Sequence, residues 1–178
     1  MTRSKPIADL RCMILTHANG EVGFGHLNRC MTLGGALREQ GAKVRLFVVG
    51  SAAIWDSLPE DAEWITLLAE LPETLPEAEL CIVDMYCYEE AIYDKIRKTS
   101  PQIIIFDDCK FTVPKAVAAV VNGNPGVARS DYPWGLQKFL GPSYLLLRDE
   151  FREQHRTVCR EHIFVCTGGS DPEKQMDR

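Results

Sequence analysis

Gly23-Phe24-Gly25-His26 lies between an apolar run of strand length and an amphipathic stretch. The run before it is Leu10-Arg11-Cys12-Met13-Ile14-Leu15-Thr16. After it, apolar residues recur at helical spacing, at Leu27, Cys30, Met31, Leu33 and Leu37. Gly41 ends the expected helix, and the apolar residues 44–49 predict the next strand. This part of the chain therefore predicts a β-loop-α-β unit with a glycine-rich turn.

The glycine turn puts His26 in the first turn of the expected helix. Backbone N–H groups and the positive end of the helix dipole meet there, which suits the turn to anions and phosphate esters. The same dipole disfavours a protonated imidazole, so we expect a neutral His26 that can act as a general base. The alternative interpretation is that His26 only caps the helix or packs beneath the loop, because glycine turns precede helices in many α/β folds.

Size and composition fit one soluble α/β domain with little chain left for a second: 178 residues, 46% hydrophobic and 25% charged. The net charge of -5 and the lack of a basic stripe argue against a nucleic-acid partner. The longest apolar runs have only strand length, so we expect no membrane span. No apolar signal core follows the basic first residues, so residues 1–9 are interpreted as a disordered leader of a cytoplasmic protein.

The seven cysteines form no CxxC pair, and their odd number fits reduced thiols in the cytosol. The four histidines lack metal-ligand spacing, so we expect no zinc site and no cofactor. No function is predicted for His17, His155 or His162. The three tryptophans are expected in the core or at an interface: Trp55, Trp64 and Trp134.

Strands and helices alternate along the rest of the chain, which predicts a mainly parallel, Rossmann-like sheet covered on both faces. Further strands are expected at 63–68, 80–84 and 103–108, and helical segments from 51, over 89–99 and around Ala116–Val120, with a turn at 121–125. Ligands bind beyond the carboxyl ends of such strands. The polar residues expected there are His26, Asp84 with Tyr86, Asp107 with Asp108, and Asn122 with Asn124.

The last third differs in character. Residues 10–150 form the expected domain, and a charged helix over about 152–161 leads to a strand at 162–167. Gly168-Gly169-Ser170-Asp171-Pro172 then forms a second phosphate-friendly turn. The helix that should follow has hardly begun at Arg178, so residues 151–178 are interpreted as a linker helix and the start of an incomplete second domain.

Several motifs in order carry a resemblance to a known family. They are Gly23-Phe24-Gly25-His26-Leu27-Asn28-Arg29-Cys30, Val83-Asp84-Met85-Tyr86, Asp107-Asp108, Asn122-Gly123-Asn124, residues 141–151 and Gly168-Gly169-Ser170-Asp171-Pro172. The chain resembles the amino-terminal half of the UDP-sugar hydrolases of pseudaminic acid biosynthesis and their spore-coat polysaccharide relatives. The histidine loop and residues 141–151 are the more specific part of the resemblance.

The resemblance implies a two-domain fold of the GT-B glycosyltransferase type, with the sugar on the amino-terminal domain and most of the nucleotide on the other. His26 would be the general base that activates water against the anomeric carbon of a UDP-linked diacetamido-trideoxy sugar, and UDP would leave. The implied substrate-binding residues are Gly23, Gly25, Arg29, Tyr86, Asn124, Gly168, Gly169 and Ser170. UDP is a good leaving group, so this scheme needs neither a strong general acid nor an obligatory metal.

The chain departs from the family where Thr16-His17-Ala18-Asn19 replaces an arginine-containing run and where Met85 replaces a histidine. Both places lie near the expected sugar pocket, so another nucleotide-linked amino sugar is an alternative substrate. Two alternative functions also stay open. One is a glycosyltransferase, in which an acceptor hydroxyl replaces water. The other is a non-catalytic partner domain that relies on a separate polypeptide for its missing half.

Overall fold

The computed structural model describes residues 7–19, 22–50, 62–65, 75–86, 89–109, 112–148 and 151. The strands are β1 (Arg11–Ala18), β2 (Lys43–Gly50), β3 (Ala62–Ile65), β4 (Leu80–Asp84), β5 (Gln102–Phe106), β6 (Ala119–Asn122) and β7 (Gln137–Leu140). The helices are α1 (Gly25–Glu39) and α2 (Glu90–Thr99), with short 3-10 turns η3 (Arg129–Asp131) and η4 (Pro142–Tyr144).

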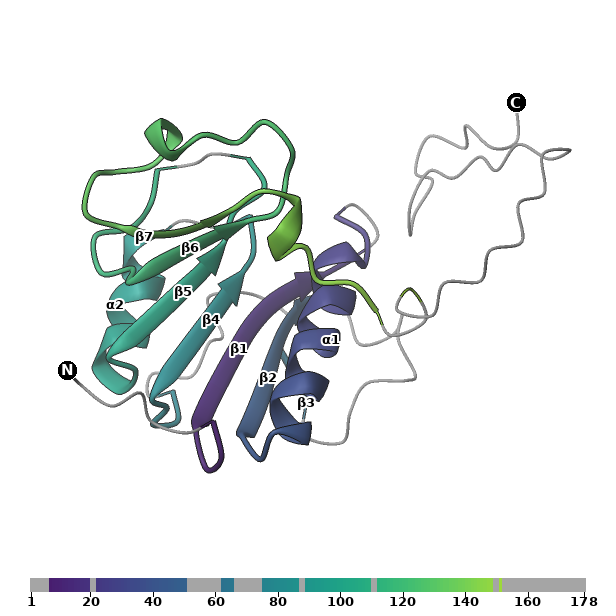
Figure 1. The fold of residues 1–178 in the computed structure, drawn as a ribbon. Coiled ribbons are helices and arrows are strands. Elements are labelled where there is room, and N and C mark those ends of the chain that lie inside the picture. The colour runs from purple at the N-terminus through teal and green to yellow at the C-terminus, as the bar shows by residue number, and fades with distance from the viewer. Residues whose placement is uncertain are drawn as a thin grey trace, which may run out of the picture.

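The described strands form one seven-stranded sheet in the order β3-β2-β1-β4-β5-β6-β7 (Figure 1). Every neighbouring pair is parallel, so the predicted Rossmann-like α/β fold is confirmed. The chain starts at β1, runs outward to β3, and returns beside β1 as β4 before it runs outward to β7. The order therefore reverses between β1 and β4, where Thr16 pairs with Asp84, and such a reversal opens a crevice for ligands.

The two helices cover opposite faces of the sheet (Figure 1). Leu27 and Cys30 of α1 pack with Ile14, Leu46 and Val48 in one buried cluster. On the other face, α2 contributes its buried residues to a cluster with strands β4 and β5: Ile92, Tyr93, Ile96, Val83 and Ile105. Because both faces are covered, the central strands read in the sequence as short continuous apolar runs.

The structure corrects one predicted element. The helical segment expected around Ala116–Val120 is wrong, because residues 119–122 form strand β6 and Val120 is completely buried. A short apolar run that is buried on both faces has no periodicity to separate a strand from a helix. The expected turn at 121–125 accordingly starts later, since Val121 and Asn122 still belong to β6.

Strand β7 was not predicted, because its residues Gln137–Leu140 are half polar and form a four-residue edge strand. Trp134 was expected in the core or at an interface; its side chain is fully exposed, which excludes the core, and the interface stays a prediction. The segments 51–55, 66–74 and 152–178 lie outside the described residues, and with them the predicted linker helix and second-domain strand.

Gly50 ends β2 at a position where no side chain fits. Its φ is 154°, and a Cβ atom there would lie 1.8 Å from the carbonyl oxygen of Ala18. We expect Gly50→Ala to lower the free energy of unfolding by about 2–4 kcal/mol, since backbone strain and overpacking add. Gly35→Ala is the matched control inside α1, where a Cβ meets nothing within 4 Å.

Gly35→Ala should raise the free energy of unfolding by about 0.5–1 kcal/mol, because alanine loses less conformational entropy in a helix. Urea unfolding followed by circular dichroism measures both variants. Equal stabilities of the two variants would contradict the close β1–β2 approach at Gly50.

Candidate functional site

The side chain of Asp84, the last residue of β4, forms the centre of the candidate site. It is completely buried and accepts from His26 Nδ1 at 2.7 Å, from Arg29 Nε and Nη2, and from Cys30 Sγ at 3.4 Å. His26, Arg29 and Cys30 are three and four residues apart, so one face of the first turns of α1 presents all of them to β4. A buried carboxylate that accepts this many bonds is fully satisfied.

The charge of Asp84 is retained at neutral pH. Burial alone raises the pKa of this carboxyl, but the hydrogen bonds and charges of Arg29 and His26 outweigh burial and hold the pKa below its usual value. An ionised carboxylate only accepts hydrogen bonds, so Nδ1 of a neutral His26 carries the proton that points to Asp84. Arg29 Nη2 lies 2.9 Å from the same Nδ1, but it donates to Asp84 Oδ1. The lone pair of that imidazole is then on Nε2.

Arg29 joins two strand ends. Its Nε and Nη2 donate to Asp84, and its Nη1 lies 2.7 Å from Oδ2 of Asp108, the second residue after β5. The guanidinium carbon also lies over the ring of Phe106, 5.5 Å from the ring centroid. The sequence placed Arg29 among the substrate-binding residues. Its carboxylate partners now account for most of its donors, and a contact between Arg29 and substrate stays a prediction.

Three rings meet beside the Asp84 pair. The ring centroid of His26 lies 4.6 Å from that of His17 and 4.5 Å from that of Tyr86, and His17 and Tyr86 are 5.3 Å apart. All three contacts are edge-to-face, a favourable geometry for aromatic rings. Tyr86 keeps 47% of its surface exposed, so one side of this ring cluster faces solvent.

His17 was given no function from the sequence, yet it belongs to this cluster. Burial, helped by the neighbouring His26, lowers the pKa of His17 to about 4, so its ring is neutral at pH 7. Among the described residues, its buried Nε2 has no hydrogen-bond partner. The sequence signal that could have found it is its position at the carboxyl end of β1, opposite the histidine loop.

The predicted glycines shape the loop that precedes α1. Gly23 has a φ of 78° and donates its N–H to the carbonyl of Asn19 at 2.9 Å, which closes the loop back on β1. Gly25 starts α1, and a Cβ there would meet no atom within 4 Å. It borders a cavity of about 160 Å³ that Arg29, Leu147 and Phe151 also line. The chain thus leaves open space beside the first turn of α1.

Asn124 holds the loop after β6. Its N–H donates to Oδ1 of Asn122 at 2.9 Å, and its Nδ2 donates to the carbonyl of Asp108 at 3.0 Å. These bonds make a turn, and the predicted contact of Asn124 with substrate stays a prediction. The remaining predicted residues, Gly168, Gly169 and Ser170, lie outside the described residues.

Within the described part of the chain, no three His, Cys, Asp or Glu side chains are grouped so that they could hold a metal ion. None of the described helices has the length and apolar character needed to cross a membrane.

Comparison with known proteins leaves the family open. No family model matches the chain. This chain is 23% identical over 181 aligned residues to the uncharacterized protein MJ1062 of Methanocaldococcus jannaschii. The alignment covers 92% of this chain but only 37% of that relative, so the chain spans little more than a third of the relative's length. No solved structure matches.

The buried ion pairs of Arg29 predict a large loss of stability when Arg29 is truncated. Arg29→Ala leaves Asp84 charged and underpaired in the core, and we expect it to lower the free energy of unfolding by about 3–5 kcal/mol. Arg45→Ala is the matched control, because Arg45 pairs with Glu63 where both side chains are about half exposed. The free energy of unfolding of Arg45→Ala should fall by less than about 1 kcal/mol. Urea unfolding of both variants tests the difference, and similar losses would contradict a buried Arg29–Asp84 pair.

The neutral His17 predicts a pH dependence of stability. The unfolded chain takes up a proton at His17 near pH 6.5, whereas the folded chain does so only near pH 4. Because the folded pKa is depressed, stability should fall as pH drops from 6.5 towards 4. His17→Gln cannot titrate, so it should flatten this part of the profile. Urea unfolding at several pH values measures it, and an unchanged slope in the variant would mean that His17 is not the group responsible.

Proposed function

We propose that this chain is the sugar-binding part of a nucleotide-sugar hydrolase, whose substrate is a UDP-linked diacetamido-trideoxy sugar of pseudaminic acid biosynthesis. Water attacks the anomeric carbon and UDP leaves. The observation that carries the proposal is the 2.7 Å bond between His26 and the buried Asp84 at the reversal point of the sheet. The proposed activity is that of a longer protein, in which a second domain would bind the nucleotide.

The proton step follows from the His26–Asp84 pair. With the Nδ1 proton held by Asp84, Nε2 of His26 takes a proton from the attacking water while the water oxygen bonds to the anomeric carbon. The carbon–oxygen bond to the diphosphate breaks, and UDP departs with the electron pair. The ionised Asp84 then stabilises the imidazolium that forms on His26, as a buried carboxylate does in other carboxylate–histidine pairs.

The charges around His26 fit the sugar better than the diphosphate. Arg29 is the cation nearest to the imidazole, and it is already bound to the carboxylates of Asp84 and Asp108. A diphosphate carries more negative charge than the N–H groups at the start of α1 can balance alone, and Arg29 is not free to add its charge. We therefore assign the sugar to the ring cluster of His17, His26 and Tyr86, and the diphosphate to groups on the second domain.

The exposed side of Tyr86 supplies the contact surface for the sugar. Burial, with smaller effects of the nearby Cys109 and Asp108, raises the pKa of the Tyr86 hydroxyl, so the group stays protonated and can donate to a sugar oxygen. Its ring contacts His26 directly, which would bring a bound sugar next to the base. Gly25 would let the backbone at the start of α1 come close to the same sugar.

A labelled-water experiment tests this function. The chain, joined to a carboxy-terminal nucleotide-binding domain, is given the UDP-linked sugar in ¹⁸O water, and UDP release and the mass of the sugar are measured. Attack by water at the anomeric carbon puts the label on the sugar and leaves UDP unlabelled. We expect His26→Gln to slow the release about 10²–10⁴-fold and to preserve sugar binding, because only the proton transfer is lost.

Each other outcome points to a different function. UDP release only after a sugar or lipid alcohol is added would make the protein a glycosyltransferase and overturn the hydrolase. Label on UDP would mean attack at phosphorus. Undiminished release by His26→Gln would remove His26 as the base. Arg45→Ala serves as the control variant, because Arg45 pairs with Glu63 at the β2–β3 edge, where both side chains are about half exposed.

A further inference from the structure

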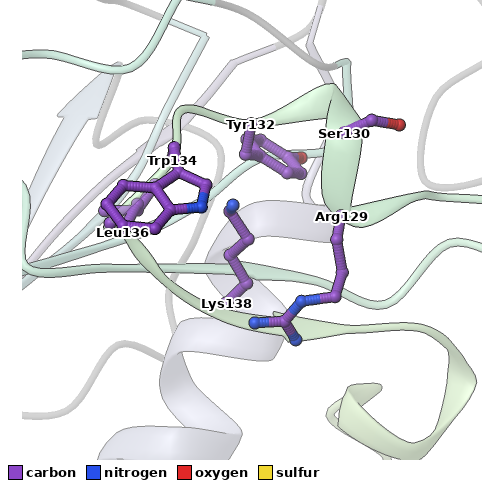
Figure 2. Close-up of a pocket in the computed structure, with 7 residues that line it drawn as sticks. Arg129, Ser130, Tyr132, Trp134, Leu136 and Lys138 are labelled. Atoms are coloured by element: carbon purple, nitrogen blue, oxygen red, sulfur yellow. The ribbon is translucent and has the colours of Figure 1, made fainter.

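A second cavity lies at the edge of the sheet, away from His26. It has a volume of about 610 Å³ and lies between the segment 129–135 and strand β7 (Figure 2). We call it the β7 cavity and define it by Arg129, Tyr132, Trp134, Leu136 and Lys138. Three strand spacings separate β7 from β4, which corresponds to roughly 14 Å. The β7 cavity is therefore distinct from the candidate site around Asp84.

The indole of Trp134 is the first unusual feature of this cavity. It is fully exposed, although a tryptophan is the side chain that gains most from burial. Figure 2 shows the ring at the rim, beside the end of Lys138. An exposed aromatic face beside a hollow is typical of a surface that stacks on a flat ring of a ligand.

The charge of the cavity is the second feature. Arg129 and Lys138 both line it, and among the described residues neither has a carboxylate within ion-pair distance. In Figure 2 both side chains extend into the same space, below Tyr132. Asp107 and Asp131 carry the nearby negative charge and act on Tyr132 in the cavity wall, whereas the two cations have no ion-pair partner among the described residues and can bind a small anion.

The walls of the cavity are fixed by the fold. The hydroxyl of the buried Tyr132 accepts from Nδ2 of Asn122 at 2.8 Å, and Leu136 packs against the hydrophobic core. The turn that carries Arg129 is closed by a bond from the N–H of Ala128 to Asp131 Oδ2 at 2.9 Å. A cavity with such walls needs little reorganisation to bind, and its volume lies in the range of small-ligand sites.

We propose that the β7 cavity binds a small phosphate monoester that carries a flat ring. The phosphate lies between Arg129 and Lys138, and the ring stacks on Trp134. The ring is either a nucleobase, which stacks its flat face on the indole, or a sugar, which lays its apolar C–H face against the indole. This site is independent of the proposed hydrolysis at His26.

Nuclear magnetic resonance titration of the chain tests this proposal. The probes are uridine 5′-monophosphate, glucose 1-phosphate and inorganic phosphate. The readout is the indole N–H signal of Trp134, which Trp134→Phe identifies among the three tryptophans. We expect at least one of the ring-bearing phosphates to shift this signal saturably and to bind about tenfold more tightly than inorganic phosphate, because stacking on the indole adds to the affinity. Whichever of these two compounds binds more tightly shows whether the site takes a base or a sugar.

The variants separate the ring contact from the charges. Trp134→Ala should lower the affinity for the ring-bearing phosphate about tenfold, to the affinity for inorganic phosphate. Arg129→Ala and Lys138→Ala, read by calorimetry, should each weaken binding of the ring-bearing phosphate about tenfold or more, because each removes a charge-assisted bond. Lys43→Ala is the control: Lys43 begins β2, five strand positions from β7 in the sheet, and this variant removes the same charge.

Three results would overturn the proposal. The first is that neither ring-bearing phosphate shifts the Trp134 signal. The second is that inorganic phosphate binds as tightly as both, which removes the ring contact. The third is that Lys43→Ala weakens binding as much as Lys138→Ala does, which would mean that only the net charge of the chain matters. Well-dispersed amide spectra of the variants show that each one is folded, so weakened binding reflects the lost side chain.

Discussion

The buried carboxylate of Asp84 is the constraint on which the arrangement of this domain depends. A charge without solvent contact costs several kcal/mol unless partners compensate it, so Asp84 needs donors close by. His26, Arg29 and Cys30 provide them, all from the first turns of α1. The pairing locks the start of α1 onto the end of β4 across the reversal point of the sheet. Together with the edge-to-face contacts to His17 and Tyr86, it also fixes the orientation of the buried His26 ring.

The polar groups beyond Asp84 extend this constraint along the carboxyl ends of the strands. Arg29 bonds to Asp108 after β5, the carbonyl of Asp108 accepts from Asn124, and Asn124 bonds to Asn122 at the end of β6. Asn122 in turn bonds to Tyr132 in the wall of the β7 cavity. One continuous set of hydrogen bonds and ion pairs thus connects α1 and the end of β4 with the loops that follow β5 and β6 and with Tyr132. Beneath it the sheet is apolar on both faces, so the loops are positioned by polar contacts and the strands by packing.

Among the described residues, the cations without an ion-pair partner lie away from His26, and this distribution of charge suits the proposed hydrolysis. The carboxylates of Asp84 and Asp108 neutralise Arg29, while His17 is kept neutral by burial. Two carboxylates face one guanidinium, so the space beside Tyr86 offers no free positive charge to a diphosphate and leaves room for a neutral sugar. The unneutralised cations Arg129 and Lys138 lie instead at the β7 edge, where a different, anionic ligand is expected. The two sites share a polar network but differ in the kind of molecule that their charges favour.

By itself, the sequence determined the class of fold and indicated where a candidate site lies. The apolar runs and the helical spacing after Gly25 predicted β1, α1, β2, β4, α2 and β5, because buried strands and amphipathic helices have distinct periods. The rule that ligands bind at the carboxyl ends of parallel strands selected His26, Asp84 and Tyr86. Periodicity failed to predict β6 and β7, because these four-residue strands are too short for a period to appear.

Only the tertiary structure decided how these residues work together. Asp84 and His26 are 58 residues apart in the sequence, and no local pattern says that they share a hydrogen bond. The contact of His17 with His26, the neutralisation of Arg29, and the cavity beside the exposed Trp134 likewise depend on which strands become neighbours. Periodicity reports which face of an element is buried, whereas the partner of a polar side chain is set by the order of strands in the sheet.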